Sequence, residues 1–359
     1  MARERVLSLR ELNRALLARQ LLLRRVSLSV PRAIERVGAL QAQWPPSPYI
    51  GLWSRLDGFR REQLVRAVER RQVVRATLMR TTLHHVSARD YLAYAGELRA
   101  RRTSSLEAQI TKFPGGADLD DFVQQVMAHA SERPRTRPEL LRLLGLPKLE
   151  LDDRRPWLVW HLLSARAGLV HAPESSAWRM NTSGAYFVPA DVWLGAQPAR
   201  GDEAVGMLLR RYLAAFGPAT RADAAQWTGL TVAALESGFE QLPLRRFRDE
   251  EGRTLYDLPR APLPAASTPV PARFLPMWDS TLLAHDDRRR ILPEAYRKTV
   301  ILKNGDVRRT FLIEGVVAGL WTIEDGRVEL EPFEAVPRRV RQELDEEARA
   351  LAEFHRAKD

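Results

Sequence analysis

The sequence predicts an α+β fold built from tandem winged-helix modules and a β-rich C-terminal region. Three times along the chain, segments with helical spacing of apolar residues are followed by a pair of strand-like segments, which is the order of a winged helix. The three repeats share this pattern only and no sequence identity. After the third repeat, a proline-rich connection leads into further strand patterns. We therefore expect a first module over residues 1–99, a linker over 100–118, a second module over 119–199, a third module over 200–262 and the β-rich region over 263–359.

The first module opens with a capping-box motif and leucines at helical spacing, which predict a helix over residues 8–24. A second helix is predicted from about Val30 to Gln41, and a third around Leu64. The segments 73–79 and 82–86 have the composition of strands and would form the wing.

The second module is a looser copy of the same pattern. Its helices are marked by Phe122, by a capping motif at Thr136 and by Trp157, and its wing strands would lie at 169–171 and 185–188.

The third module is the clearest. A first helix ends near Gly217, Thr220 caps a short helix, Gly229 makes the turn, and Thr231 caps the next helix. That spacing is typical of a helix-turn-helix, and the segment 244–258 would form its hairpin wing.

The C-terminal region begins after an extended stretch with four prolines over 261–271. Strong local patterns predict the remaining elements. They are a hairpin over 299–313 on an Asn-Gly turn, strands over 316–323 and 327–330, and an amphipathic helix over 338–355.

Composition narrows the function classes. The formal net charge of +11 points to a polyanionic partner such as nucleic acid. The absence of cysteine excludes disulfides, zinc knuckles, iron–sulfur clusters and thiol nucleophiles. No apolar run approaches the length of a signal core or a membrane span, so we expect a soluble, cytoplasmic protein that binds no membrane. Residues 285–287, a histidine followed by two aspartates, resemble metal ligands. We interpret them as a polar loop, so no metal and no cofactor are expected.

Two features favour contact with DNA. A helix-turn-helix in a basic protein usually binds DNA, although such helical cores also serve as protein–protein scaffolds. The turn around Lys303, with Arg308 and Arg309 on the returning segment, could enter a groove or grip phosphates. The alternative is an ordinary solvated turn, and Asp306 weakens the phosphate interpretation slightly.

The motif Gln41-Ala42-Gln43, followed by Trp44 and two prolines, is the candidate for chemistry. On a helix, two amides two residues apart would point about 200° apart, whereas on an extended segment they could converge. The prolines would supply that break at the end of the second helix. Neutral amides cannot act as general bases, but they can hold a water molecule and turn carbonyl dipoles toward a developing positive charge. A solvated helix end is the alternative.

Five segments together resemble the winged-helix DNA glycosylases of the AlkZ/YcaQ type, and they span nearly the whole chain. They are Leu-Gln-Ala-Gln-Trp at 40–44, Tyr-Ile-Gly-Leu-Trp-Ser-Arg-Leu at 49–56, the run 74–84, Phe-Gly-Pro-Ala-Thr at 216–220, and the stretch from Arg-Phe-Leu-Pro at 273–276 to Val-Ala-Gly-Leu-Trp at 317–321. The Gln-x-Gln form is similar to the AlkZ-like branch, whereas the YcaQ-like branch has Asp in the second place.

The resemblance implies tandem winged helices around a C-shaped DNA channel and a monofunctional enzyme that excises guanine alkylated at N7, including bulky adducts and interstrand crosslinks. Relatives of this kind often protect bacteria that make DNA-alkylating natural products. Alkylation at N7 makes guanine a cationic leaving group, so a placed water and a stabilised oxocarbenium-like sugar could suffice. No lysine stands near the motif, which makes a Schiff-base lyase step unexpected.

These arguments give the expected site. Gln41 and Gln43 would be catalytic, and the partner would be double-stranded DNA carrying alkylated guanine, bound by a monomer associated with the nucleoid. Residues beside the motif, on or beside the wing of the first module, or on the C-terminal hairpin would contact DNA. They are Trp44, Arg75, Arg80, Thr82, His84, Lys303, Arg308 and Arg309. The rival hypotheses are a non-enzymatic DNA-binding regulator or architectural protein, with helix 231–239 or 155–167 in a major groove, and a protein scaffold.

Overall fold

The computed structural model of the chain describes residues 4–109, 118–145, 156–175, 178 and 184–357. Its N-terminal part contains helices and short strands in the order β1 (Val6–Leu7), α1 (Leu9–Arg19), α2 (Val30–Val37), β2 (Leu40–Gln41), α3 (Pro46–Trp53), α4 (Arg61–Glu69), β3 (Val73–Thr77), β4 (Leu83–Ser87) and α5 (Ala88–Glu107). The predicted capping box at the start of α1 is present, with Ser8 and Glu11 bonding to each other's backbone N–H groups.

Three predictions for this part need correction. Helix α2 ends at Val37 and does not reach Gln41, because Gly38 caps it with φ of 91°, a conformation that glycine adopts most readily. The two prolines after Trp44 do not only break the chain: Pro46 begins α3, since its fixed φ suits the first turn of a helix. The predicted linker over 100–118 starts as helix, because α5 continues to Glu107, and residues 110–117 lie outside the described residues.

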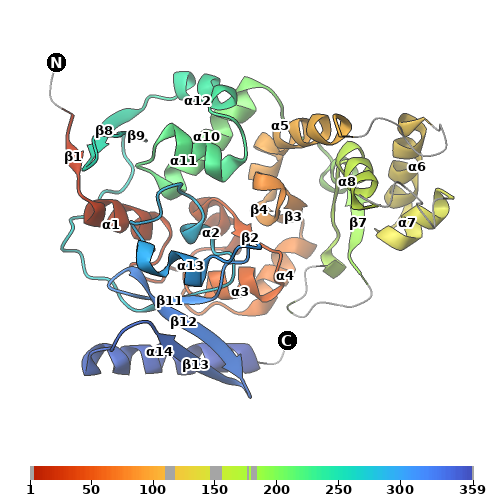
Figure 1. Cartoon of the computed structure of the whole chain (residues 1–359). Helices are drawn as coiled ribbons and strands as arrows, with labels where there is room; N and C mark the ends of the chain where they lie inside the picture. Colours follow the sequence, from red (N-terminus) through yellow and green to blue (C-terminus); the bar gives the residue numbers. More distant parts are fainter. Residues whose placement is uncertain (1–3, 110–117, 146–155, 176–177, 179–183, 358–359) are drawn as a thin grey trace.

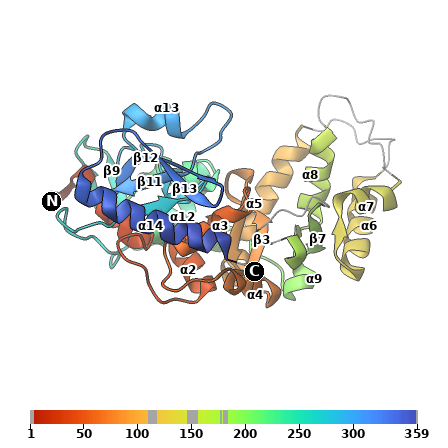
Figure 2. The same ribbon diagram turned by 90° about the horizontal axis from the view of Figure 1, so that it is seen from below.

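The first two predicted modules share one sheet. The second contributes α6 (Leu119–Glu132), β5 (Arg135–Thr136), α7 (Arg137–Leu143), α8 (Pro156–Arg166), β6 (Leu169–His171), β7 (Tyr186–Pro189) and α9 (Ala190–Leu194). The sheet order is β2-β4-β3-β6-β7-β5, and Arg75 on β3 pairs with His171 on β6 at the junction. The second part nevertheless keeps its own apolar core, and α6 and α7 lie at one end of the molecule, beyond α8 (Figures 1 and 2).

The third part follows the prediction closely. Helix α10 (Asp202–Phe216) precedes α11 (Arg221–Thr228), a 3₁₀ turn (Ala233–Leu235), α12 (Glu236–Gln241) and the hairpin of β8 (Arg245–Asp249) and β9 (Thr254–Asp257). Thr220 caps α11 in a capping box, and Gly229 ends α11 with φ of 76°. Strand β1 adds itself in parallel to β8, which the sequence pattern did not indicate.

The C-terminal region forms an antiparallel sheet in the order β10 (Arg273–Leu275), β11 (Thr310–Ile313), β12 (Val316–Glu324) and β13 (Arg327–Pro332). Helix α14 (Arg338–Arg356) packs against β13 (Figure 1). The predicted strand at 299–302 is wrong: α13 (Arg297–Val300) occupies its start, and the Asn-Gly loop is closed by a bridge between Ile301 and Val307.

One hydrophobic core joins the N-terminal, third and C-terminal parts. Buried side chains from α1, α10, β11 and α14, such as Leu16, Tyr212, Phe311 and Leu351, belong to the same cluster. The same cluster also includes Val170 and Val188 of the second part, so all four parts pack against one another. Within the described ranges, no helix combines the length and apolar character needed to cross a bilayer.

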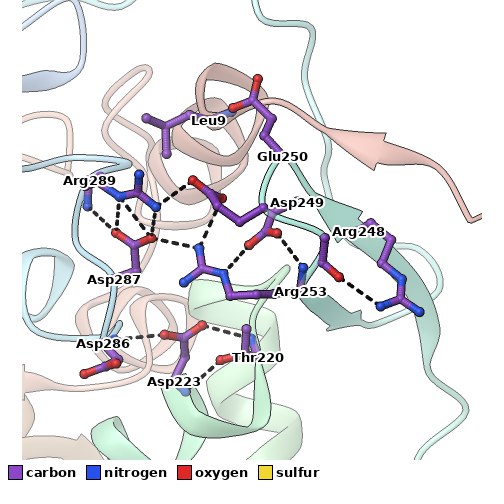
Figure 3. A network of polar contacts seen from close by, with 12 residues as sticks. Leu9, Thr220, Asp223, Arg248, Asp249, Glu250, Arg253, Asp286, Asp287 and Arg289 are labelled. Atoms are coloured by element: carbon purple, nitrogen blue, oxygen red, sulfur yellow. Dashed lines mark hydrogen bonds and ion pairs between the residues drawn. The ribbon is translucent and has the colours of Figure 1, made fainter.

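Polar contacts also fasten the C-terminal region to the third part (Figure 3). Asp287 accepts hydrogen bonds from Arg289 and from Arg253, whose guanidinium also binds Asp249 of β8. The hydrogen bonds from Arg289, the largest cause, and from Arg253 lower the pKa of Asp287 below its usual range. Asp287 thus takes part in ion pairs, whereas His285 is buried beside the Phe216 carbonyl.

Candidate active site

The Gln-x-Gln motif begins on the edge strand β2, which ends at Gln41, rather than at a helix end. Strand β2 pairs with β4, so that Gln41 stands opposite His84, and the Ala42 N–H donates to the Leu83 carbonyl at 2.8 Å. Because side chains alternate along an extended segment, Gln41 and Gln43 point to the same side. Their amides meet there: Gln41 Nε2 donates to Gln43 Oε1 at 2.7 Å. The expected convergence is observed, and strand pairing produces it together with the proline break.

Gln41 is enclosed by residues of the loop between β3 and β4. It is only 5% exposed, whereas Gln43 is exposed. The Arg80 guanidinium lies 3.4 Å from Gln41 Oε1, and Gln41 Nε2 donates to Thr82 Oγ1 at 3.3 Å. The side-chain amide of Gln41 is therefore held by hydrogen bonds inside the protein, whereas that of Gln43 is open to solvent.

Arg80 connects this loop to the third part of the chain. Its Nη1 donates to the carbonyl of Trp227, one of the last carbonyls of α11, at 2.9 Å. Burial, the larger cause, and the charge of Arg288 lower the pKa of Arg80 to about 10, so the guanidinium stays charged at neutral pH. Arg80 itself has a positive φ of 52°, which its two anchoring contacts maintain.

Arg75 supports the motif from the other side of the sheet. Its Nη2 donates to the Ala42 carbonyl at 3.0 Å, and its Nη1 donates to the Ser175 carbonyl. Arg75 is buried, and burial lowers its pKa to about 10. This burial leaves Arg75 little surface for the expected DNA contact, and its observed role is to hold the backbone between the two glutamines.

His84 is also buried, with none of its surface exposed. Its Nδ1 lies 2.9 Å from the Thr82 carbonyl, which can only accept, so Nδ1 carries the proton. Burial, and secondarily the charge of Arg80, lower the pKa of His84 to about 3. His84 therefore has no exposed surface in this structure for the expected DNA contact. His85 lies on the opposite face, beside Arg75, because side chains alternate along a strand.

The C-terminal region reaches the motif through Trp44 and Arg309. The Arg309 guanidinium lies 5.4 Å from the centre of the Trp44 ring and 5.0 Å from that of Trp321, within cation–π range. Burial lowers the pKa of Arg309, with a smaller effect from the neighbouring charge of Arg308. Arg309 is thus part of the packing that joins β11 and β12 to the motif.

The Asn-Gly loop carries the remaining predicted cations. Lys303 is exposed at its tip, and Arg308 is partly exposed with its guanidinium 3.8 Å from Glu331. The loop is braced by Trp278, whose Nε1 donates to the Gly305 carbonyl at 3.2 Å. Lys303 and Arg308 therefore remain available to a polyanion.

Sequence reasoning missed two supporting residues. Trp278 braces the loop, and Gly229 lets the third part approach Arg80, because a Cβ on Gly229 would lie 2.8 Å from the Arg80 nitrogen. Gly229 carried a local signal as a turn residue, but nothing in the pattern indicated what it would touch. Trp278 carried no signal.

The model of the family "DNA glycosylase AlkZ-like" matches residues 34–354. The interstrand DNA cross-link repair glycosylase of Streptomyces sahachiroi is 27% identical over 348 residues, covering 93% of this chain and 93% of that protein.

The solved structure of the Streptomyces sahachiroi DNA glycosylase AlkZ superimposes with a TM-score of 0.81 at 23% identity, covering 97% of this chain and 96% of that chain. This likeness confirms the predicted mixed α and β architecture. Since the family model matches most of the chain, the expected enzyme class is confirmed as well. The chain belongs to the AlkZ-like DNA glycosylase family.

Proposed function

We propose that this protein is a monofunctional DNA glycosylase that hydrolyses the N-glycosidic bond of cationic N7-alkylguanine, in bulky adducts or interstrand crosslinks. The observation that carries the proposal is the amide pair, with Gln41 and Gln43 in contact at 2.7 Å and Gln43 open to solvent. The similarity to a cross-link repair glycosylase supports the substrate class.

The chemistry suits neutral amides. The oxygen of a water molecule forms a bond to C1′ while the C1′–N9 bond breaks, and the N9 electron pair neutralises the alkylated guanine. The water loses one proton to bulk solvent as the C1′–O bond forms, while an amide oxygen accepts a hydrogen bond from it and orients it without becoming protonated. Because the leaving group is already cationic, placement of the water and dipolar stabilisation of the sugar supply the catalysis. The segment around the motif, residues 40–46, has no lysine for a Schiff base.

We further infer that the tandem parts surround the duplex in a C-shaped channel. The net charge of +11 and the exposed Lys303 and partly exposed Arg308 support contact with phosphates. Both glutamines come from one chain, so the proposal requires only a monomer, acting on nucleoid DNA in the cytoplasm.

A non-enzymatic regulator is less consistent with the helices it would need. The side chains of α8 from Leu158 to Ala165 are buried or half-buried, and α8 contacts α5 and α6. Helix α12 has six residues, and its Gly238 packs on Val205 and Leu209 of α10. Neither helix offers the long exposed face that reads bases in a major groove.

The test is release of base from a duplex carrying N7-methylguanine and from one carrying a defined N7 crosslink, detected as abasic sites. We expect release by the wild type and strongly reduced release by Gln41→Ala/Gln43→Ala. Equal rates for the two proteins, or a sequence-selective footprint on undamaged DNA without any base release, would contradict the proposal.

A further inference from the structure

The hydrogen-bond network around Gln41 permits one orientation of its amide. Arg80 has only donors, so the atom of Gln41 that faces it at 3.4 Å must be Oε1. Thr82 gives its single hydroxyl proton to the Met79 carbonyl at 3.1 Å and can therefore only accept from Gln41 Nε2. Two independent partners thus fix the same orientation, which the positions of heavy atoms alone would not decide.

This orientation decides how Gln43 is held. Gln41 Nε2 has two hydrogens: one goes to Thr82 and the other to Gln43 Oε1. Gln43 must therefore turn its oxygen toward Gln41 and keep it there. That oxygen retains a second lone pair, and Gln43 is the exposed member of the pair, whereas the donors of Gln41 are occupied and its side chain is 5% exposed.

We propose that the two glutamines have different roles: Gln43 is the catalytic residue whose Oε1 accepts from the attacking water, and Gln41 is a positioning residue whose amide is oriented by Arg80 and Thr82. The inference rests on the proposed glycosylase function. Arg75 complements it by holding the Ala42 carbonyl, so that both the backbone and the first amide are fixed before DNA binds.

Matched glutamate variants separate the two roles. In Gln41→Glu, a carboxylate replaces the donor that faces Gln43 Oε1, so the Gln43 amide rotates to donate and removes its oxygen from the water. We expect single-turnover excision to fall about 10²-fold, the effect of misplacing a reacting group by about 1 Å. Gln43→Glu keeps an acceptor for both Gln41 and the water and adds negative charge beside the cationic sugar, so we expect its single-turnover rate to fall at least tenfold less than that of Gln41→Glu.

Arg80 variants test the positioning step with a rescue. Arg80→Met should lower the single-turnover rate and leave the Kd for lesion DNA within about twofold, because Arg80 is bound to Trp227 and Gln41 inside the protein. Arg80→Lys, which keeps a charged donor, should restore part of the rate. A loss confined to Kd would assign Arg80 to DNA binding and overturn the inference.

A measurement on the free protein is independent of activity. With glutamine labelled by ¹⁵N, and resonances assigned by substitution of Gln41 and Gln43 to Asn, the side-chain amide signal of Gln43 should shift in Arg80→Met and in Gln41→Glu. If the wild type releases no base while these shifts occur, the proposed function fails and the network stands. If the wild type is active and the two glutamate variants lose equal activity, or if the Gln43 amide signal does not move, the division of roles is wrong.

Discussion

Substitution of Gly229 by alanine tests whether the turn after α11 supports the loop between β3 and β4 that carries Arg80, which is the catalytic loop of the proposed function. The new Cβ would lie 2.8 Å from the Arg80 nitrogen and 3.0 Å from its Cα, and these backbone atoms cannot rotate away as a flexible side chain would. Gly229 also has a φ of 76°, where an L-residue costs about 1–2 kcal/mol. Overpacking typically adds about 1–3 kcal/mol, so the free energy of unfolding should fall by about 2–5 kcal/mol in total.

Gly195→Ala is the matched control. Gly195 ends α9 with φ of 71° and ψ of 17°, close to the 76° and 12° of Gly229, but a Cβ there has nothing within 4 Å. It carries the conformational cost of about 1–2 kcal/mol without the contact. Equilibrium urea unfolding of the two variants therefore isolates the contribution of the contact with Arg80.

The two variants should also differ in activity. Displacing the Arg80 backbone by a few tenths of an ångström moves the guanidinium that faces Gln41, so single-turnover excision should fall in Gly229→Ala and stay unchanged in Gly195→Ala. Equal destabilisation of the two variants, together with unchanged excision in both, would refute the reasoning that the turn of the third part supports the catalytic loop.

Three further predictions concern stability and binding. Asp257→Ala removes the carboxylate that lies 2.7 Å from the guanidinium of Arg19, and that guanidinium is fully buried. The free energy of unfolding, measured in urea, should fall by about 3–5 kcal/mol because the charge of Arg19 loses its partner. A loss below about 1 kcal/mol would contradict this. His84 and His85 have pKa values lowered to about 3 by burial, so between pH 6.5 and 3 the unfolded chain binds protons that the folded one does not. Stability should fall with decreasing pH in that window, by up to about 1.4 kcal/mol per pH unit for each histidine, and a urea midpoint unchanged between pH 7.5 and 5 would argue against it. Lys303→Ala/Arg308→Ala should weaken DNA binding and reduce the slope of log K against log salt by about 0.9 for each lost phosphate contact, while the single-turnover rate at saturation stays the same; an unchanged slope would remove the loop from the interface.

Elements specified by short-range signals were predictable. The capping boxes at Ser8 and Thr220, the turn at Gly229 and the helix over residues 338–356 depend on residues within a few positions of one another. The resemblance added the overall architecture, and the convergence of the Gln41 and Gln43 amides was expected for an extended segment.

The rest depended on contacts between distant segments. An arginine has the same sequence appearance whether it faces solvent or is buried, so Arg75 and Arg80 were expected to contact DNA although they bind carbonyls at Ala42 and Trp227. The end of α2 depended on a close approach: a Cβ on Gly38 would lie 3.1 Å from the Cβ of Ala215, far away in the chain. Local periodicity contains no information of this kind.

The pairing of β3 with β6 connects the second part of the chain to the sheet edge that carries the two glutamines. Arg75 pairs with His171 in the shared sheet, binds the Ser175 carbonyl beyond it and holds the Ala42 carbonyl under the glutamines. A tilt of the second part would thus reach the backbone between Gln41 and Gln43 through Arg75 as well as through the shared sheet. Under the proposed function, the fit of the second part against a duplex would therefore affect how the two glutamines are placed.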